Sequence, residues 1–193
     1  MNTKPVAVLD LDDTLINTRE AMYQCVRAEY GRDFVSHWSS WEKFKFEENT
    51  AIDVHELIEL TTEKRTFDAI EPHPHAAFYT EDLIRRGFHV IILTAREGFV
   101  PDPYDTTARY LCRHGIDYDE LLISAHGDNK MNSLTKYDRI DFTIDDQVKN
   151  CEHFEESGKI DHIFLHALPH NKLCNRYRRL HSLYQAYKHL GLE

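Results

Sequence analysis

Four aspartates that follow two short apolar runs are the residues of this sequence best placed to do chemistry. Asp10 and Asp12 come directly after one run, and Asp145 and Asp146 come after another. Alternation along an extended segment directs the side chains of Asp10 and Asp12 the same way. Converging carboxylates repel one another unless a cation lies among them, and hard oxygen ligands with an open position suit Mg²⁺. We therefore predict a Mg²⁺ site at these four residues.

A second group of residues could bind an oxyanion such as phosphate. Thr94 follows a third apolar run and offers a hydroxyl, and the main-chain amides of Ala95 and Arg96 are expected donors at the exit turn of that strand. A phosphoryl group in transfer also needs a cation beside its equatorial oxygens. Lys130 and Lys136 are both candidates, and the sequence does not decide between them.

Each of these features, taken alone, has a purely structural interpretation. A DxD sequence occurs on protein surfaces and in calcium-binding turns, and an Asp-Asp pair often caps a helix. Their order favours chemistry: DxDxT follows the first apolar run, Thr-Ala-Arg the next, and a lysine then precedes Asp-Asp after a later run.

Five short apolar runs must position these residues. They are unalternating and largely β-branched, which is typical of strands buried on both faces of a parallel sheet. They span residues 6–9, 90–93, 121–123, 142–144 and 163–165.

Helical segments are expected between most of these runs. Three of them end at a glycine that suits a helix C-terminus, and a fourth is indicated by apolar residues at helical spacing. These segments span residues 76–86, 106–114, 148–157 and 173–190. We predict an α/β fold with a doubly wound parallel sheet, in which ligands bind at the carboxyl ends of the strands.

One interval, residues 19–70, contains no buried-strand run. It has helix-like stretches at 21–30 and 53–63 and a cluster of aromatic residues, and it ends before two closely spaced prolines. We predict that residues 19–70 form a small helical cap, and that residues 1–18 and 71–193 form the α/β core.

Composition limits the classes of partner. The chain has 193 residues and a formal net charge of −10, which disfavours nucleic acid or an anionic membrane as the main ligand. No apolar run approaches the roughly 20 residues that span a bilayer, and the first residues do not resemble a signal peptide. Four scattered cysteines suit a reducing compartment. A cytoplasmic protein is expected; a homodimer is compatible with the sequence, which does not fix the oligomeric state.

The ordered motifs resemble those of the haloacid dehalogenase (HAD) superfamily of phosphatases. The segments VLDLDDTL, IILTAR and FTIDD are similar to its first, second and fourth motifs, and a lysine between the last two supplies the third. The segments IEPHPHAA, FLHALPHN and RRLHSLYQAYKHL further resemble the 5′(3′)-deoxyribonucleotidase and 5′-nucleotidase branch.

This resemblance implies roles for individual residues. Asp10 is expected to be the nucleophile that forms an aspartyl-phosphate, and Asp12 the general acid and then base. Mg²⁺ would be bound by Asp10, by the main-chain carbonyl of Asp12 and by one or both of Asp145 and Asp146. Asp13 stands where many members have glycine.

In the same family, a cap inserted after the first motif covers the site, and in nucleotidases its aromatic residues stack on the base. Five aromatic residues are candidates for stacking on a base, although we interpret them first as residues that pack the small cap. They are Trp38, Trp41, Phe44, Phe46 and Phe67. Arg19 is interpreted as a solvated hinge residue, with contact to substrate as the alternative.

The expected activity is Mg²⁺-dependent hydrolysis of nucleoside 5′-monophosphates, which are small-molecule phosphomonoesters. Deoxyribonucleotides are the favoured substrates. An alternative keeps the chemistry but changes the substrate to 3′-phosphate ends of nucleic acid or to sugar phosphates. More remote alternatives are a phosphorylation-dependent switch of the receiver type and a binding protein without catalysis.

Overall fold

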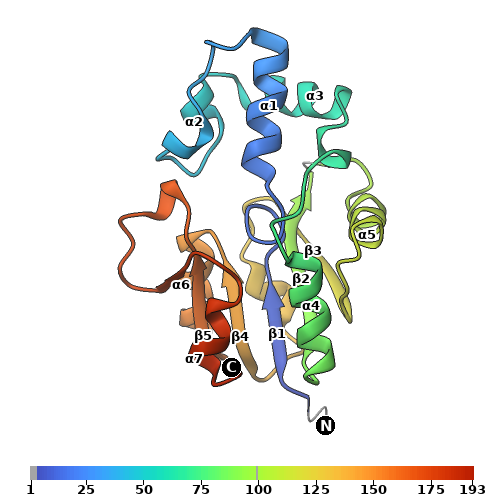
Figure 1. Ribbon diagram of the computed structural model, residues 1–193, viewed down its shortest axis with the longest axis vertical. Helices are drawn as coiled ribbons and strands as arrows, with labels where there is room; N and C mark the ends of the chain where they lie inside the picture. The colour runs from blue at the N-terminus through green and yellow to red at the C-terminus, as the bar shows by residue number, and fades with distance from the viewer. Residues whose placement is uncertain (1–3, 99) are drawn as a thin grey trace.

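Short apolar segments form a six-stranded sheet in the computed structural model, which describes residues 4–98 and 100–193. The strand order is β3-β2-β1-β4-β5-β6, and every neighbouring pair is parallel (Figure 1). The strands are β1 Val6–Leu9, β2 His89–Glu97, β3 Glu120–Ala125, β4 Ile140–Asp145, β5 Ile160–His166 and β6 Arg178–Leu180. The prediction of an α/β parallel sheet is confirmed.

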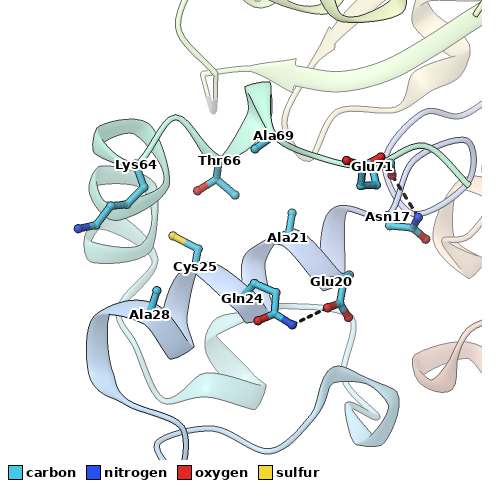
Figure 2. Close-up of a pocket in the computed structure, with 10 residues that line it drawn as sticks. All are labelled: Asn17, Glu20, Ala21, Gln24, Cys25, Ala28, Lys64, Thr66, Ala69 and Glu71. Carbon is cyan, nitrogen blue, oxygen red and sulfur yellow. Dashed lines mark hydrogen bonds between the residues drawn. The ribbon is translucent and has the colours of Figure 1, made fainter. Parts of the chain in front are cut away.

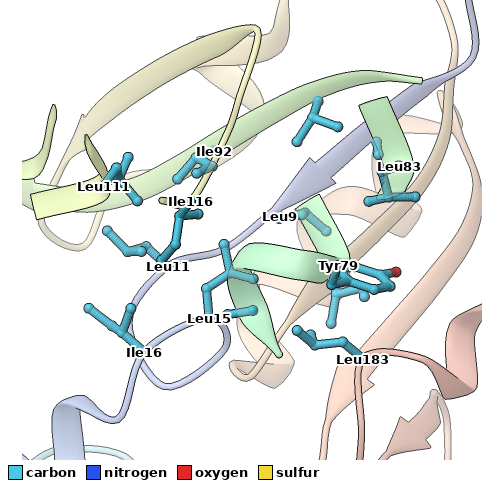
Figure 3. Packing of buried hydrophobic residues seen from close by; sticks show 14 of the residues in the cluster. Leu9, Leu11, Leu15, Ile16, Tyr79, Leu83, Ile92, Leu111, Ile116 and Leu183 are labelled. Carbon is cyan, nitrogen blue, oxygen red and sulfur yellow. The ribbon is translucent and has the colours of Figure 1, made fainter. Parts of the chain in front are cut away.

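Residues of β1 alternate between the two faces of the sheet, as the pleat of a strand requires. Ala7 and Leu9 belong to the large core cluster, which also contains side chains from α4, α5 and α7. Figure 3 shows Leu9 of this cluster with Tyr79 and Leu83 of α4 and Leu111 of α5. Val6 and Val8 face a second cluster, to which α6 and η3 contribute. The bounds are α4 Ala76–Arg85, α5 Pro103–Arg113, η3 Lys130–Leu134, α6 Val148–Ser157 and α7 Gln185–Leu190. Helical elements thus cover both faces, which makes the sheet doubly wound.

Only helical elements lie between β1 and β2 before α4, and they stand above the sheet (Figure 1). They are α1 Thr18–Tyr30, η1 Trp38–Ser40, α2 Glu47–Thr50, α3 Val54–Glu63 and η2 Thr66–Asp68. Trp41, with 2% of its surface exposed, packs with Val26 and Leu57 in an apolar cluster of this segment's own. We keep the name cap for residues 19–70.

The two chain segments that join the cap to the core are tied together. Ile16 makes isolated bridges to Asp12 and to Pro72. The main-chain N–H of Asn17 donates to the carbonyl of Glu71 at 2.9 Å, and its side chain donates to the same carbonyl and to that of Pro72. The cap therefore leaves and re-enters the core through adjacent backbone segments.

The expected helix over 173–190 is wrong. Leu173 is 84% exposed, residues 178–180 form β6 beside β5, and only Gln185–Leu190 is α-helical. Tyr177, Leu180 and Tyr187 are buried as the spacing suggested, but they reach the core from a loop, a strand and a helix. Pairing with the exposed edge of β5 overrides the local periodicity, because a strand satisfies backbone groups that the edge would leave open.

The expected exit turn after Thr94 is also wrong. β2 continues through Ala95 and Arg96 to Glu97, which pairs with Ala125 of β3 after an irregularity in the register. Among the described residues, no helix has both the length and the apolar character needed to cross a membrane.

Candidate active site

The loop after β1 places Asp10 at the carboxyl edge of the sheet. Its main-chain N–H donates to the carbonyl of Ile144 in β4 at 2.9 Å, which holds the two strand ends together. The carboxylate accepts a hydrogen bond from Thr14 at 3.1 Å, and its other oxygen lies 2.5 Å from Nζ of Lys130. Asp10 is 5% exposed, so these contacts lie inside the protein.

Asp145 and Asp146 follow β4 on the neighbouring strand. Nζ of Lys130 lies 2.8 Å from Oδ2 of Asp145, so one ammonium bridges Asp10 and Asp145. Asp10, Asp145 and Asp146 offer carboxylate oxygens that lie within 4.8 Å of one another. Oδ2 of Asp146 is buried and accepts no hydrogen bond of good geometry, although Nε2 of His170 lies 3.2 Å away.

The charges of this region do not balance. Among the described residues, five aspartates at the loop and at the end of β4 face three arginine or lysine cations; they are Asp10, Asp12, Asp13, Asp145 and Asp146 against Arg19, Arg96 and Lys130. Lys130 is shared between Asp10 and Asp145, and in the described part of the chain neither an arginine nor a lysine pairs with Asp146. Burial raises the pKa of Asp10 well above its usual range, and Asp145 and Asp146 add to the effect while Lys130 opposes it.

These observations fit a divalent cation at Asp10, Asp145 and Asp146. Its two positive charges would balance five ionised carboxylates against the three fixed cations, and Oδ2 of Asp146 is a buried oxygen that accepts no hydrogen bond. The donors are all hard oxygens, which suit Mg²⁺. Asp12 is different, because its side chain lies outside this cluster of ligand atoms.

The carboxylate of Asp12 is held by Arg96. Nε and Nη2 of Arg96 donate to its two oxygens at 2.8 and 2.7 Å, and Thr18 and Thr94 donate to the same oxygens at 2.7 and 2.9 Å. Although burial opposes it, the charge of Arg96 together with these hydrogen bonds lowers the pKa of Asp12 to about 2. Thr107 of α5 accepts a further bond from Arg96 at 3.2 Å. The expected phosphate-binding hydroxyl of Thr94 is therefore directed at Asp12.

Asp13 has φ of 62°, in the left-handed region. This region favours glycine and tolerates aspartate, which is consistent with the glycine expected here from the resemblance to the HAD superfamily. Its main-chain carbonyl accepts a hydrogen bond from Nδ1 of His166 at 2.7 Å. Its carboxylate faces Arg19, which is only 2% exposed, so the interpretation of Arg19 as a solvated hinge residue is wrong.

The two candidate lysines are separated by the fold. Lys130 is 3% exposed and lies between Asp10 and Asp145. Lys136 is exposed and pairs with Glu120, the first residue of β3, and so it lies toward the amino ends of the strands. The interpretation of Lys136 as a site residue is therefore wrong, because the short η3 helix turns the chain back along the sheet before Lys136 is reached.

Three residues that support the site were not predicted. Asn150 of α6 donates to both oxygens of Asp145 at 3.0 and 3.1 Å. His170 and Asn171 of η4 (Pro169–Asn171) donate to the main-chain carbonyl of Asp146 at 3.0 and 2.8 Å. The position of Asn150 just over one helical turn beyond the Asp pair was a usable signal. No local spacing connects residues 170–171 with Asp146.

A pocket of about 450 Å³ lies away from this site, between α1 and the segment that returns from the cap (Figure 2). Glu20 and Glu71 line it together with small side chains of α1. A second cleft of about 270 Å³ separates Glu42 and Lys43 of the cap from residues 169–174. The second cleft adjoins the site, because His170 lines it and also contacts Asp146.

Comparison with known proteins identifies the family of the chain. A family model described as 5′ nucleotidase, deoxy (Pyrimidine), cytosolic type C protein matches residues 4–192. The chain belongs to this family. The nucleotidase family places it among the phosphatases of the HAD superfamily, and the expected superfamily and enzyme class, a phosphoric monoester hydrolase, are confirmed. No curated protein sequence matches the chain significantly.

Solved structures agree with the fold of this nucleotidase family member. A haloacid dehalogenase-like hydrolase from Streptococcus pneumoniae is 12% identical, with a TM-score of 0.65 over 98% of this chain and 100% of the other. The HAD-hydrolase YfnB from Bacillus subtilis, bound to magnesium, is 11% identical, with a TM-score of 0.66 over 97% and 98%. At this identity the likeness shows the fold alone.

Proposed function

We propose that the protein is a Mg²⁺-dependent phosphatase that hydrolyses deoxyribonucleoside or ribonucleoside 5′-monophosphates through an aspartyl-phosphate at Asp10. The observation that carries the proposal is the buried cluster of Asp10, Asp145 and Asp146 with Lys130 bridging two of its members. The family match supports the substrate class, and the magnesium in the B. subtilis structure supports the choice of cation.

In the first step, a carboxylate oxygen of Asp10 attacks phosphorus, and the bond from phosphorus to the ester oxygen breaks. Thr14 and Lys130 contact the two oxygens of Asp10 and fix the direction of its carboxylate. Lys130 also carries the positive charge that equatorial phosphoryl oxygens require. Its pKa is raised by Asp10 and Asp145 against the effect of burial, so it is charged at neutral pH.

In the second step, water attacks phosphorus of the aspartyl-phosphate and releases phosphate, while Asp12 accepts a proton of that water. The four hydrogen bonds from Arg96, Thr18 and Thr94 favour the ionised carboxylate, which is the state a base needs. Earlier, the leaving alkoxide takes its proton from Asp12, which must be protonated for this step and is then left ionised. Because Arg96 disfavours protonated Asp12, the first step should be slow for poor leaving groups.

Asp10, Asp145, Asp146 and the main-chain carbonyl of Asp12 would hold Mg²⁺. When bound, the cation neutralises the carboxylates and polarises the phosphoryl group. We also propose that the main-chain amides of Ala95 and Arg96 donate to phosphoryl oxygens, because both residues lie where the register between β2 and β3 is interrupted. The side chains of Thr94 and Arg96 are assigned to Asp12 instead, since both already donate to its carboxylate.

A screen of phosphomonoesters tests this function. Nucleoside 5′-monophosphates, 3′-phosphorylated oligonucleotides and sugar phosphates are compared with Mg²⁺ present and with Mg²⁺ chelated. The proposal predicts Mg²⁺-dependent release of phosphate, fastest from the 5′-monophosphates. Faster release from 3′-phosphate ends or sugar phosphates would contradict the substrate class, and no metal-dependent release from any of them would contradict the activity.

A further inference from the structure

The side chain of Arg19 connects the loop of the nucleophile to the cap. Arg19 is the second residue of α1, only 2% exposed, and its Nε lies 2.9 Å from Oδ2 of Asp13. Its main-chain N–H donates to the other oxygen of Asp13 at 2.7 Å. Asp13 is three residues from Asp10, in the same tight loop, so one end of this contact is fixed to the catalytic edge of the sheet.

The other end of the guanidinium holds the cap. Nη2 of Arg19 donates to the main-chain carbonyl of Phe44 at 2.9 Å, and Nη1 contacts that of Lys43 at 3.4 Å. The guanidinium carbon lies 5.7 Å from the ring centre of Phe44 and 5.1 Å from that of Phe46. An arginine fork can contact a carboxylate on one side and two carbonyls on the other, whereas a lysine ammonium cannot span them.

The cap segment held in this way forms one wall of the cleft beside the metal ligands. Lys43 lines that cleft, and the ring of Phe44 contacts the ring of His170 at 5.4 Å. His170 in turn lies 3.2 Å from Oδ2 of Asp146. We place a substrate part larger than the phosphoryl group in this cleft, between the wall that contacts Arg19 and the core residues 169–174, where Lys172 pairs with Glu42 of the wall.

We propose that Arg19 is a positioning residue that holds the Lys43–Phe44 wall at the distance from the nucleophile loop that a nucleoside leaving group requires. This rests on the proposed function, because it assumes that the nucleoside part lies against the cap. Arg19 contacts no reacting atom in this role. Arg19 fixes the position of the cap wall. Its replacement should therefore lower the activity most for substrates that contact this wall.

The test compares Arg19→Met and Arg19→Lys with the wild type on a nucleoside 5′-monophosphate and on the smaller nitrophenyl phosphate, with Mg²⁺ present. We expect kcat/KM for the nucleotide to fall by about 10²-fold in both variants, mainly through KM, and by much less for nitrophenyl phosphate. Arg27→Met is the matched control, because Arg27 also lies on α1 over an aromatic ring, that of Tyr23. It should leave both activities unchanged.

A double variant guards against failure to fold. Asp13→Asn with Arg19→Met removes the ion pair without leaving a buried charge, and asparagine tolerates the left-handed backbone at this position. Equal losses for both substrates, or none for either, in a folded variant would overturn the role of Arg19. Absence of Mg²⁺-dependent activity in the wild type would instead overturn the proposed function, so the two failures are distinguishable.

Discussion

Nζ of Lys130 lies 2.5 Å from Oδ1 of Asp10, and both side chains are almost completely buried. The lysine comes from η3, on the chain segment between β3 and β4, whereas the aspartate follows β1. The contact therefore exists only in the folded sheet. It brings the proposed nucleophile and the cation that would receive phosphoryl charge within one hydrogen bond of each other.

Replacement of Lys130 by Met should lower kcat by about 10²- to 10³-fold, because it removes the fixed positive charge beside the phosphoryl group. It should also destabilise the metal-free protein by about 3–5 kcal/mol, since Asp10 and Asp145 lose their shared partner. Lys136→Met is the matched control and should change neither quantity appreciably, because Lys136 is exposed. Steady-state kinetics and urea denaturation measure both effects; equal losses in the two variants would contradict the assignment.

Mg²⁺ should raise the melting temperature of the wild type in a saturable manner. Binding to the native state alone stabilises it by about 2.7 kcal/mol at one hundred times Kd, which corresponds to a rise of several degrees. In Asp146→Asn this rise should shrink strongly. Asp161→Asn, at an exposed residue that pairs with Arg139, should retain it. Thermal denaturation measures this rise in melting temperature. If Mg²⁺ raises the melting temperature of Asp146→Asn as much as that of the wild type, Asp146 is not a metal ligand.

Replacement of Arg96 by Met should shift the acidic limb of the pH profile of kcat to higher pH. Arg96 opposes the effect of burial and lowers the pKa of Asp12 to about 2, so the wild type should keep Asp12 ionised at all pH values well above 2. Without Arg96, burial alone raises that pKa, and the base becomes protonated at higher pH. Nitrophenyl phosphate is the suitable substrate, because its good leaving group makes the second step limiting. Coincident limbs in wild type and variant would contradict the role of Arg96.

His73 should make stability sensitive to acid. Burial lowers its pKa to about 4, and the neighbouring His166 adds to the effect; their ring centres are 5.1 Å apart. The unfolded chain titrates near 6.5, so the stability that neutral His73 contributes is present above pH 6.5 and is lost as pH falls toward 4.

The melting temperature of His73→Phe should therefore fall by a few degrees less than that of the wild type between pH 6.5 and 4. The exposed His55 of α3 offers the control His55→Phe, which accounts for the loss of a histidine as such. Parallel curves for His73→Phe and wild type would contradict the prediction.

Local patterns were sufficient to predict the sheet and the edge at which the aspartates gather. Buried β-branched runs gave β1 to β5, and the polar residue after each run marked the edge where Asp10 and Asp145 meet. Local patterns failed where pairing with a strand distant in the sequence determines the secondary structure. β6 forms because the edge of β5 is available, and residues 178–180 have no strand pattern of their own.

The partners of the site residues were harder to predict than the residues themselves. Lys130 and Lys136 are six positions apart, and only the path of η3 and the turn after it puts one at the carboxyl edge and the other toward the amino ends. The ion pair of Arg96 with Asp12 joins residues 84 positions apart. Such contacts depend on strand order, which no short spacing in the chain encodes.

A search for the phosphorylated enzyme is the most direct test of the aspartyl-phosphate at Asp10. Asp12→Asn is mixed with nitrophenyl phosphate and Mg²⁺, quenched in acid, digested and analysed by mass spectrometry. The first step needs no acid with this leaving group, whereas water activation needs Asp12, so the intermediate should accumulate. We expect a peptide that carries one phosphoryl group on Asp10 and that is absent when Asp10 is also replaced by Asn. Release of nitrophenol with no phosphoryl group on Asp10, or with one on another residue, would contradict it.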